Sequence, residues 1–218
     1  MSEQFSGQVT VVDGQGRTVF SFDSGFAVLD LGATGNEGDL RLRGDDGATK
    51  IHLDGGRQLI VMNNAAGETT IQLEGNTGDI RLLGADCAEE FDIDDPAEAV
   101  PGTVLTIGHA GRLRACTEPY DRRVAGVVSG AMGFRPGIVM DGRGGASRAA
   151  VALTGKVYCR ADARPAPIET GDLLTSSATV GHAMRASEPS LAFGATLGKA
   201  LHPLPDGTGL IPVLVTLH

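Results

Sequence analysis

Pairs of apolar residues separated by one residue recur through the first third of the chain, and this repeat constrains the fold more than any other feature. The first members of successive pairs lie 11, 9, 11, 11, 9, 11 and 9 residues apart. Glycines lie between the pairs, and clear units read DLRLRGDDG (39–47) and TIQLEGNTG (70–78). The eight pairs are Val9/Val11, Phe20/Phe22, Leu29/Leu31, Leu40/Leu42, Ile51/Leu53, Ile60/Met62, Ile71/Leu73 and Ile80/Leu82.

Each unit has the pattern of a short, half-buried strand. Alternation of apolar and polar residues turns one face inward and the other toward water. Glycine with Asn or Asp supplies the positive-φ corners that a chain reversing every ten residues requires. The intervening residues, such as Arg41, His52 and Gln72, are polar and suit a solvated outer wall. Because one unit buries only two side chains, the units must stack on neighbours to be stable.

Three architectures are compatible with this pattern. The first is a hairpin meander, in its plainest form an antiparallel sheet packed on the C-terminal domain. The second is a single-chain β-solenoid with two units per coil. The third is an intertwined triple-stranded β-helix or β-prism, in which three chains each contribute a wall around one apolar axis. We favour the third, because one chain with 4% aromatic residues would form a thin core, and winding chains together removes free strand edges. The sixteen residues of the eight pairs would then line the shaft interior.

The repeat ends at Leu83-Gly84, and the sequence predicts a repetitive β shaft (1–85), an acidic hinge (86–100) and a C-terminal β domain (101–218). The segment DCAEEFDIDDPAE (86–98) is rich in acids but breaks the spacing of an EF-hand loop. We therefore expect a solvated hinge whose Phe91 docks on the next domain.

The C-terminal region has short β-branched segments bounded by Gly, Pro or Asp, and no ten-residue amphipathic helical stretch. It predicts a compact all-β barrel or sandwich. Arg135-Pro136-Gly137 is one of the expected turns. The expected strands are 104–107, 112–116, 124–129, 149–159, 172–177, 195–201 and 210–217.

Four segments of residues 86–218 carry a family resemblance. They are DCAEEFD, then PGTVLTIGHAGRLRACTEPYDRRVAGVVSG, then VALTGKVYCRADARPAPIETGDLLTSSATVGHAMRA, then GATLGKALHPLPDGTGLIPVLV, of which IETGDLLTSS (168–177) followed by GHAM (181–184) is the most specific. In this order they resemble the C-terminal domain of phage tail-spike, appendage and related bacterial fibre proteins, a group that includes the peptidase G2 family of autoprocessing chaperone domains. Units of the TIQLEGNTG type resemble the shafts of such fibres. The resemblance implies a trimeric structural module, without establishing proteolysis here.

Charge and hydropathy exclude several classes of partner. The chain has 18 Lys and Arg against 27 Asp and Glu, a net charge of −9, and no basic cluster. Nucleic acids and anionic lipid surfaces bind proteins through Lys and Arg, so neither is an expected partner. No run of 18 apolar residues and no secretory signal is visible, so we expect no membrane insertion. We expect cytoplasmic synthesis and, following the resemblance, assembly into a virion or phage-tail-like particle.

No catalytic, cofactor or metal site is predicted. Autocleavage would need a nucleophile, for which Ser129, Ser176, Ser177 and the carboxylates of 86–95 are candidates, yet the chain ends where the barrel is expected to end, with no long tail to release. The cysteines show no CxxC spacing, so we expect reduced thiols, with Cys116 and Cys159 as small core residues. The histidines show no HxH, HExxH or HxxxH pair; they are His52, His109, His182, His202 and His218.

The leading hypothesis is therefore a non-enzymatic, homotrimeric fibre or spike protein whose C-terminal domain directs or locks trimerisation. Its partners would be other copies of the chain, together with components of a tail-like particle or a surface glycan. One alternative is a glycan- or receptor-binding module of such a particle, although sugar stacking would depend on Tyr120 and Tyr158 because the chain has no Trp. The other alternative is an autoprocessing domain of the peptidase G2 type.

Overall fold

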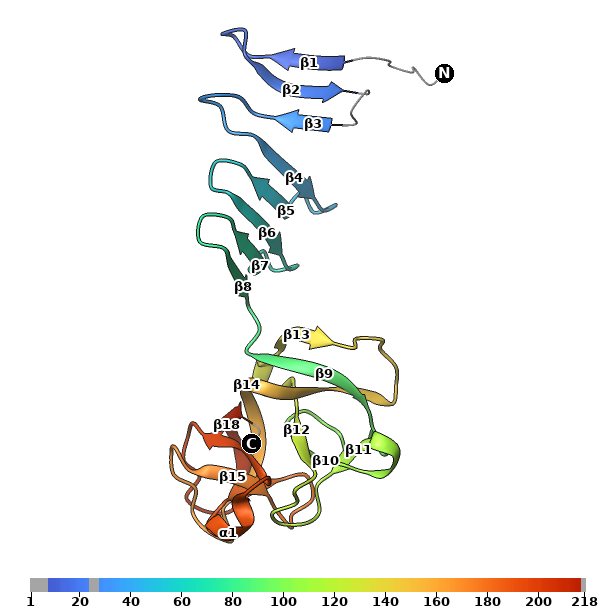
Figure 1. Cartoon of the computed structure of the whole chain (residues 1–218), viewed down its shortest axis with the longest axis vertical. Coiled ribbons are helices and arrows are strands. Elements are labelled where there is room, and N and C mark those ends of the chain that lie inside the picture. Colours follow the sequence, from blue (N-terminus) through green and yellow to red (C-terminus); the bar gives the residue numbers. More distant parts are fainter. Residues whose placement is uncertain (1–7, 24–27, 217–218) are drawn as a thin grey trace. The chain divides into compact units, whose positions relative to one another are not determined.

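The computed structural model describes residues 8–23 and 28–216, and across these residues the chain is all-β, as predicted. The chain divides into two compact units, Met1–Leu83 and Gly84–His218. Each unit has its own hydrogen-bonded sheets (Figure 1). The repeat thus ends two residues before the predicted end of the shaft at residue 85.

The first unit is a meander of antiparallel strands. Its strands are β1 (Gln8–Val12), β2 (Thr18–Asp23), β3 (Val28–Leu31), β4 (Asp39–Arg43), β5 (Thr49–Asp54), β6 (Leu59–Asn63), β7 (Thr69–Glu74) and β8 (Asp79–Leu82). They form a three-stranded sheet, β1-β2-β3, and a five-stranded sheet, β4-β5-β6-β7-β8. A solenoid with two units per coil would pair each strand with the second one along, so these pairings contradict the solenoid alternative. One wall of a prism would also be a meander, so the triple-stranded shaft stays a prediction.

Three hairpin turns of this unit share one geometry, which explains why the repeat needs glycine. Gly16, Gly47 and Gly67 have φ of 79°, 75° and 82°, in the left-handed region that favours glycine. Each donates its amide to the carbonyl three residues earlier, at 3.0–3.1 Å. A register shift at the end of the preceding strand accompanies each turn. This is the three-residue type of hairpin loop with a glycine bulge, which fixes the strand register.

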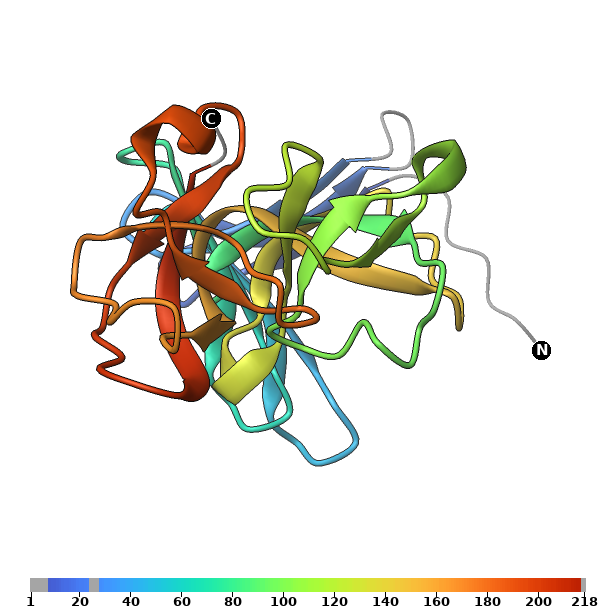
Figure 2. The same ribbon diagram turned by 90° about the horizontal axis from the view of Figure 1, so that it is seen from below.

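The second unit is a ten-stranded sheet that closes on itself in part. Its strands are β9 (Asp86–Asp92), β10 (Val104–Ile107), β11 (Leu113–Ala115), β12 (Val124–Val128), β13 (Pro136–Met140), β14 (Arg148–Asp162), β15 (Leu173–Ser176), β16 (Ala183–Arg185), β17 (Thr196–Ala200) and β18 (Thr208–Thr216). Its helical turns are η1 (His109–Gly111), η2 (Ala131–Gly133) and α1 (Pro189–Ala192). The pairings β14-β16-β15-β17-β18-β14 form a closed five-stranded barrel, the orange and red ribbons of Figure 2. The predicted C-terminal barrel is confirmed.

The long strand β14 joins this barrel to the remaining strands. Its second half pairs with β18, and its first half pairs with β9 and β12, which continue to β13 and to β10 and β11. The barrel is filled by small and branched side chains, including Val157, Leu174 and Leu197, which are fully buried. A second cluster around Leu105 and Val151 lies under the strands that extend from it.

Residues 86–92 do not form the predicted hinge. They are strand β9, which pairs antiparallel with β14 and parallel with β13, and Phe91 packs against the second core cluster. Two of the acids that suggested a solvated segment, Glu90 and Asp92, lie 3.4 Å from the guanidinium of one cation, Arg148. That Arg148 side chain is only 12% exposed. For these two acids, charge reflects ion pairing within a sheet and not a solvated hinge.

Candidate functional site

The apolar pairs of the repeat lie opposite one another across every strand of the first unit. In the five-stranded sheet they form two columns, Leu40–Leu53–Ile60–Leu73–Ile80 and Leu42–Ile51–Met62–Ile71–Leu82. In the three-stranded sheet the columns are Val9–Phe22–Leu29 and Val11–Phe20–Leu31. We call these sixteen residues the apolar ladder. Residues that face each other across a pleated sheet share a face, so the ladder occupies one face of each sheet.

The ladder is open to solvent in the single chain. Twelve of its sixteen side chains are exposed, between 36% and 70%, and the other four are half-buried. Among the described residues, every fully buried apolar side chain belongs to the second unit, between Ala88 and Val215. The repeat unit therefore has no hydrophobic core of its own. The predicted enclosure of these residues in a shaft remains a prediction.

The ladder continues across the break between the two sheets of the first unit. A shallow apolar groove at this break is lined by Leu29 and Leu31 of β3 and by Leu40, Leu53 and Ile60 of the five-stranded sheet. The amide of Gly55 donates to the carbonyl of Gly38 at 3.0 Å, which ties the linking segment to the end of β5. The two stretches of ladder therefore form one apolar surface, larger than the scattered apolar residues normal for a soluble monomer.

The opposite face of the five-stranded sheet is mostly polar, and its acidic and basic side chains lie in separate rows across the strands. One row across the strands is Asp39–Asp54–Leu59–Glu74–Asp79, and the next row is Arg41–His52–Val61–Gln72–Arg81. Ion pairs join the rows, with Arg41 at 2.5 Å from Asp39 and Arg81 at 3.1 Å from Glu74. This face is suited to water, as the sequence predicts for the outer wall, so the ladder is the face that lacks a partner.

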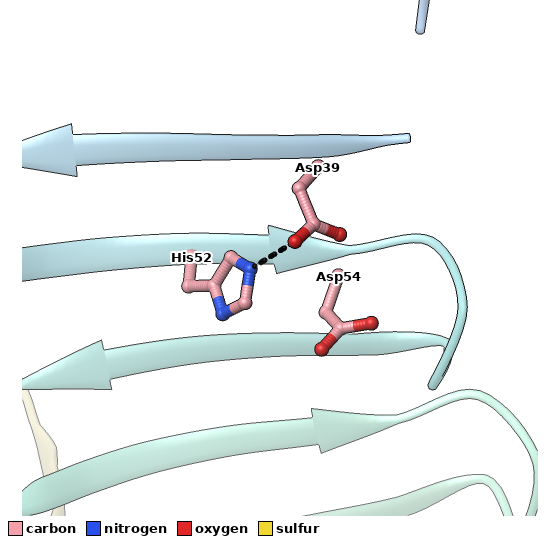
Figure 3. Close-up of side chains that lie close together, drawn as sticks. All are labelled: Asp39, His52 and Asp54. Atoms are coloured by element: carbon pink, nitrogen blue, oxygen red, sulfur yellow. Dashed lines mark hydrogen bonds and ion pairs between the residues drawn. The ribbon is translucent and has the colours of Figure 1, made fainter. Parts of the chain in front are cut away.

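One group in the described part of the chain has the composition and proximity of a metal-binding cluster. It comprises Asp39 of β4 with His52 and Asp54 of β5, whose potential ligand atoms lie within 4.8 Å of one another (Figure 3). Spacing along the sequence missed this group because its members come from two strands. The signal that could have found it is the hairpin register: pairing Leu40 with Leu53 places Asp39 opposite Asp54.

The other candidate residues lie in local structural roles. His182 Nδ1 is 2.7 Å from the carbonyl oxygen of Val180, His202 Nδ1 is 3.1 Å from that of Pro203, and His109 lies in η1. The structure brings none of these three into a cluster of metal-ligating side chains. His218 lies outside the described residues.

The cysteine and serine candidates are mostly buried. Cys116 and Cys159 belong to the same core cluster, as predicted, and burial raises the pKa of both thiols. Ser129 donates to the carboxylate of Asp86 at 2.9 Å, and the hydroxyl of Ser176 accepts the amide of Asp121 at 2.8 Å. Both serine hydroxyls are thus hydrogen-bonded within the core, whereas Asp86 Oδ2 is buried without a partner.

Both tyrosines make contacts within the chain. Tyr158 packs edge-on against Phe134, with ring centroids 4.9 Å apart, and the hydroxyl of Tyr120 accepts the amide of Glu188 at 2.9 Å. Neither contact suggests that these tyrosines form a surface on which a sugar ring stacks. The glycan alternative therefore rests on the resemblance alone.

Comparisons with known proteins name no family for this chain. No protein-family model matches it, and no curated protein matches it significantly. Among the described residues, no helix is both long and apolar enough to span a membrane. The resemblance to fibre proteins therefore remains a prediction, and the function must be argued from the geometry of the two units.

Proposed function

We propose that this chain is a non-enzymatic structural protein of the fibre or spike type, assembled as a homotrimer through the apolar ladder. The observation that carries the proposal is that a single-layer sheet presents a continuous, two-residue-wide apolar face to solvent, while none of the described apolar side chains of its unit is buried. A sheet needs a second layer over its apolar face to form a core. In this proposal, other copies of the chain supply that layer.

A second copy of the chain is a suitable partner for the ladder, because its own ladder has the same length, spacing and chemistry. The ladder repeats Leu, Ile and Met over the five strands β4–β8 and Val, Phe and Leu over β1–β3, so identical walls can interdigitate along their whole length. Three such walls enclose one apolar line while each keeps its charged rows toward water. The polar face, with its acidic and basic rows, would repel a second apolar layer because burying those charges is costly.

The second unit supports the same proposal from the other part of the chain. Its five-stranded barrel has a complete core, so it can fold before the repeat finds its partners. We infer that it directs or locks trimerisation, as the resemblance implies, and thereby raises the effective concentration of the three ladders. We propose that such a trimer is a component of a tail-like particle or a virion.

The mass of the protein in solution tests the proposal. Sedimentation equilibrium should give three times the chain mass of 22.4 kDa. The mass should hold over a wide range of protein concentration, because burial of a long apolar interface gives a low dissociation constant. A species of 22.4 kDa at micromolar concentration, with the β-sheet signal of the repeat intact, would contradict the proposal.

A further inference from the structure

The cluster of Asp39, His52 and Asp54 lies on the polar face of the five-stranded sheet, opposite the ladder. Leu40 and Leu53 belong to the ladder, so the residues that flank them in sequence project to the other side. Figure 3 shows the His52 ring directed at Asp39 from the neighbouring strand, with Asp54 beside it. The group is therefore independent of the proposed trimer and stays on the outer wall in that arrangement.

The hydrogen bonds of His52 Nε2 cannot all be satisfied. This nitrogen lies 3.1 Å from Asp39 Oδ2, which requires it to donate, and 3.1 Å from Arg41 Nε, which requires it to accept. One ring nitrogen cannot do both, whichever tautomer or charge state the imidazole adopts. A bound cation removes the conflict, because it takes lone pairs from the imidazole and the carboxylate together.

Two further features point to a ligand at the same place. Asp39 Oδ1 is buried and has no hydrogen-bond partner, which is unusual for a carboxylate oxygen. The Asp54 side chain is only 10% exposed, and its hydrogen bond from the amide of Arg57 holds the carboxylate in place beside the cluster. The guanidinium of Arg41, 2.5 Å from Asp39 Oδ2, is the positive charge beside Asp39, and Arg57 Nε lies 4.0 Å from Asp54 Oδ2.

We propose that Asp39, His52 and Asp54 form a binding site for a divalent transition-metal ion of the Zn²⁺ type, with water completing the coordination. One imidazole nitrogen with two carboxylate oxygens is a donor set that Zn²⁺ takes, whereas Ca²⁺ and Mg²⁺ prefer oxygen ligands alone. Arg41 must swing away when the ion binds, and its side chain is half exposed, so it can do so into solvent.

The site would fasten the edge of the five-stranded sheet. β4 is the first strand of that sheet and pairs only with β5 within it. An ion held by Asp39 on β4 and by two side chains of β5 crosslinks the two strands at the end away from their turn at 44–47. Binding would therefore stabilise the pairing of an otherwise exposed edge strand.

Calorimetric titration of the chelator-treated full chain with ZnCl₂ tests the proposal, with His52→Gln as the disrupting variant and His202→Gln as its control. His202 lies on the surface of the second unit, so its loss leaves the cluster unchanged. We expect one ion per chain in the wild type and in His202→Gln. Binding should be at least about 10-fold weaker in His52→Gln, which has lost the imidazole ligand.

Arg41→Gln provides the decisive comparison. Removing the competing guanidinium should tighten Zn²⁺ binding, whereas a cluster that is only an ion-pair network would lose a partner and gain no affinity. If Arg41→Gln bound Zn²⁺ and the wild type did not, the site would still be supported. The Arg41 guanidinium would then be the group that occupies it in the wild type. Binding equal in the wild type and His52→Gln, or absent from both the wild type and Arg41→Gln, would overturn the proposal.

Discussion

At the scale of single residues, an aspartate followed two positions later by an arginine recurs three times in the second unit. The pairs are Asp121/Arg123, Asp141/Arg143 and Asp162/Arg164, and in each the guanidinium donates two hydrogen bonds to the carboxylate. This fork-to-fork contact holds the intervening loop residue in place. The spacing of the motif is visible in the sequence, but the fork between the two side chains appears only in the structure.

Asp162 is the most enclosed of these carboxylates and should contribute most to stability. It is 3% exposed and accepts the Arg164 guanidinium at 2.8 and 2.9 Å and the Thr179 hydroxyl at 2.5 Å. The guanidinium of Arg164 in particular holds the pKa of the Asp162 carboxyl well below its usual range. Asp162→Asn should lower the free energy of unfolding by about 2 kcal/mol at pH 7, measured by urea titration.

The pH dependence of this loss has a defined sign. Because the folded pKa is depressed, the ionised carboxylate stabilises the fold above the unfolded pKa of about 3.9, and that contribution falls as pH drops through the folded value. The difference in the free energy of unfolding between the wild type and Asp162→Asn should therefore be constant at pH 5–7 and should narrow below about pH 4. Asp206→Asn, at an exposed site, should show no such gap. A gap that widened in acid would contradict this account.

Two neighbouring residues of β7 test which face of the repeat is covered. Ile71 belongs to the ladder, and Gln72 lies on the polar face between Val61 and Arg81. Ile71→Asp would place one charge per chain against the shared interior, at a cost of several kcal/mol each, and should abolish the trimer. Gln72→Asp should keep the trimeric mass. A trimeric mass for Ile71→Asp in sedimentation, equal to that of Gln72→Asp, would show that the ladder is not the contact surface.

At the scale of the elements, pattern alone predicted most of the strands. The eight repeat strands and seven C-terminal strands lie at or near the expected positions, because alternation and flanking Gly or Pro are local signals. The sequence predicts a hinge in place of β9 because Glu90 and Asp92 find their cation, Arg148, on a strand that begins 56 positions beyond Asp92. The short strand β16 was missed, since its three residues show too little alternation to read.

The segment Pro136-Gly137 was expected to be a turn but begins strand β13. Proline is tolerated there because it is the first residue of an edge strand. The start of this strand passes so close to Gly84 that only glycine fits at position 84: a Cβ on Gly84 would come within 1.9 Å of the Gly137 nitrogen. A glycine at this position marks the close approach of two segments. The sequence alone does not distinguish such a glycine from one that lies in a turn.

This close approach makes Gly84 sensitive to substitution. Gly84→Ala should destabilise the second unit by about 3 kcal/mol, because the clash is with backbone atoms that cannot move aside. Gly142→Ala is the matched control, since its added methyl would meet only Val139 at 3.8 Å. Thermal melts should show a lower midpoint for the first variant alone. Equal midpoints would indicate that the two segments separate readily.

The two candidate sites differ in how far sequence could predict them. The ladder follows directly from the alternation of residues 9–82, so its sixteen members were named without the structure. The Asp39, His52 and Asp54 cluster depends on which residues face each other across β4 and β5, and a one-residue slip would move every side chain to the other face. Its prediction would have required the bulge at Leu42/Arg43 as well as the turn.

At the scale of the whole molecule, the two units obtain their stability in different ways. The second unit buries a continuous set of apolar side chains within one chain, whereas the described residues of the first unit bury none. A sheet without a core does not offset the conformational entropy lost on folding. The first unit should therefore be ordered only when its ladder is covered, and its folding should be coupled to assembly.

Separating the units at Leu83 gives the strongest test of this coupling. The fragment 84–218 should unfold cooperatively with a midpoint close to that of the same unit in the full chain, because its core is complete. The fragment 1–83 should lack a stable sheet by circular dichroism at low concentration and gain one only as its mass rises. In the full chain, dilution should lower the melting temperature of the repeat first. A monomeric fragment 1–83 with a cooperative melt would show that the exposed ladder needs no partner, and the homotrimer would lose its physical basis.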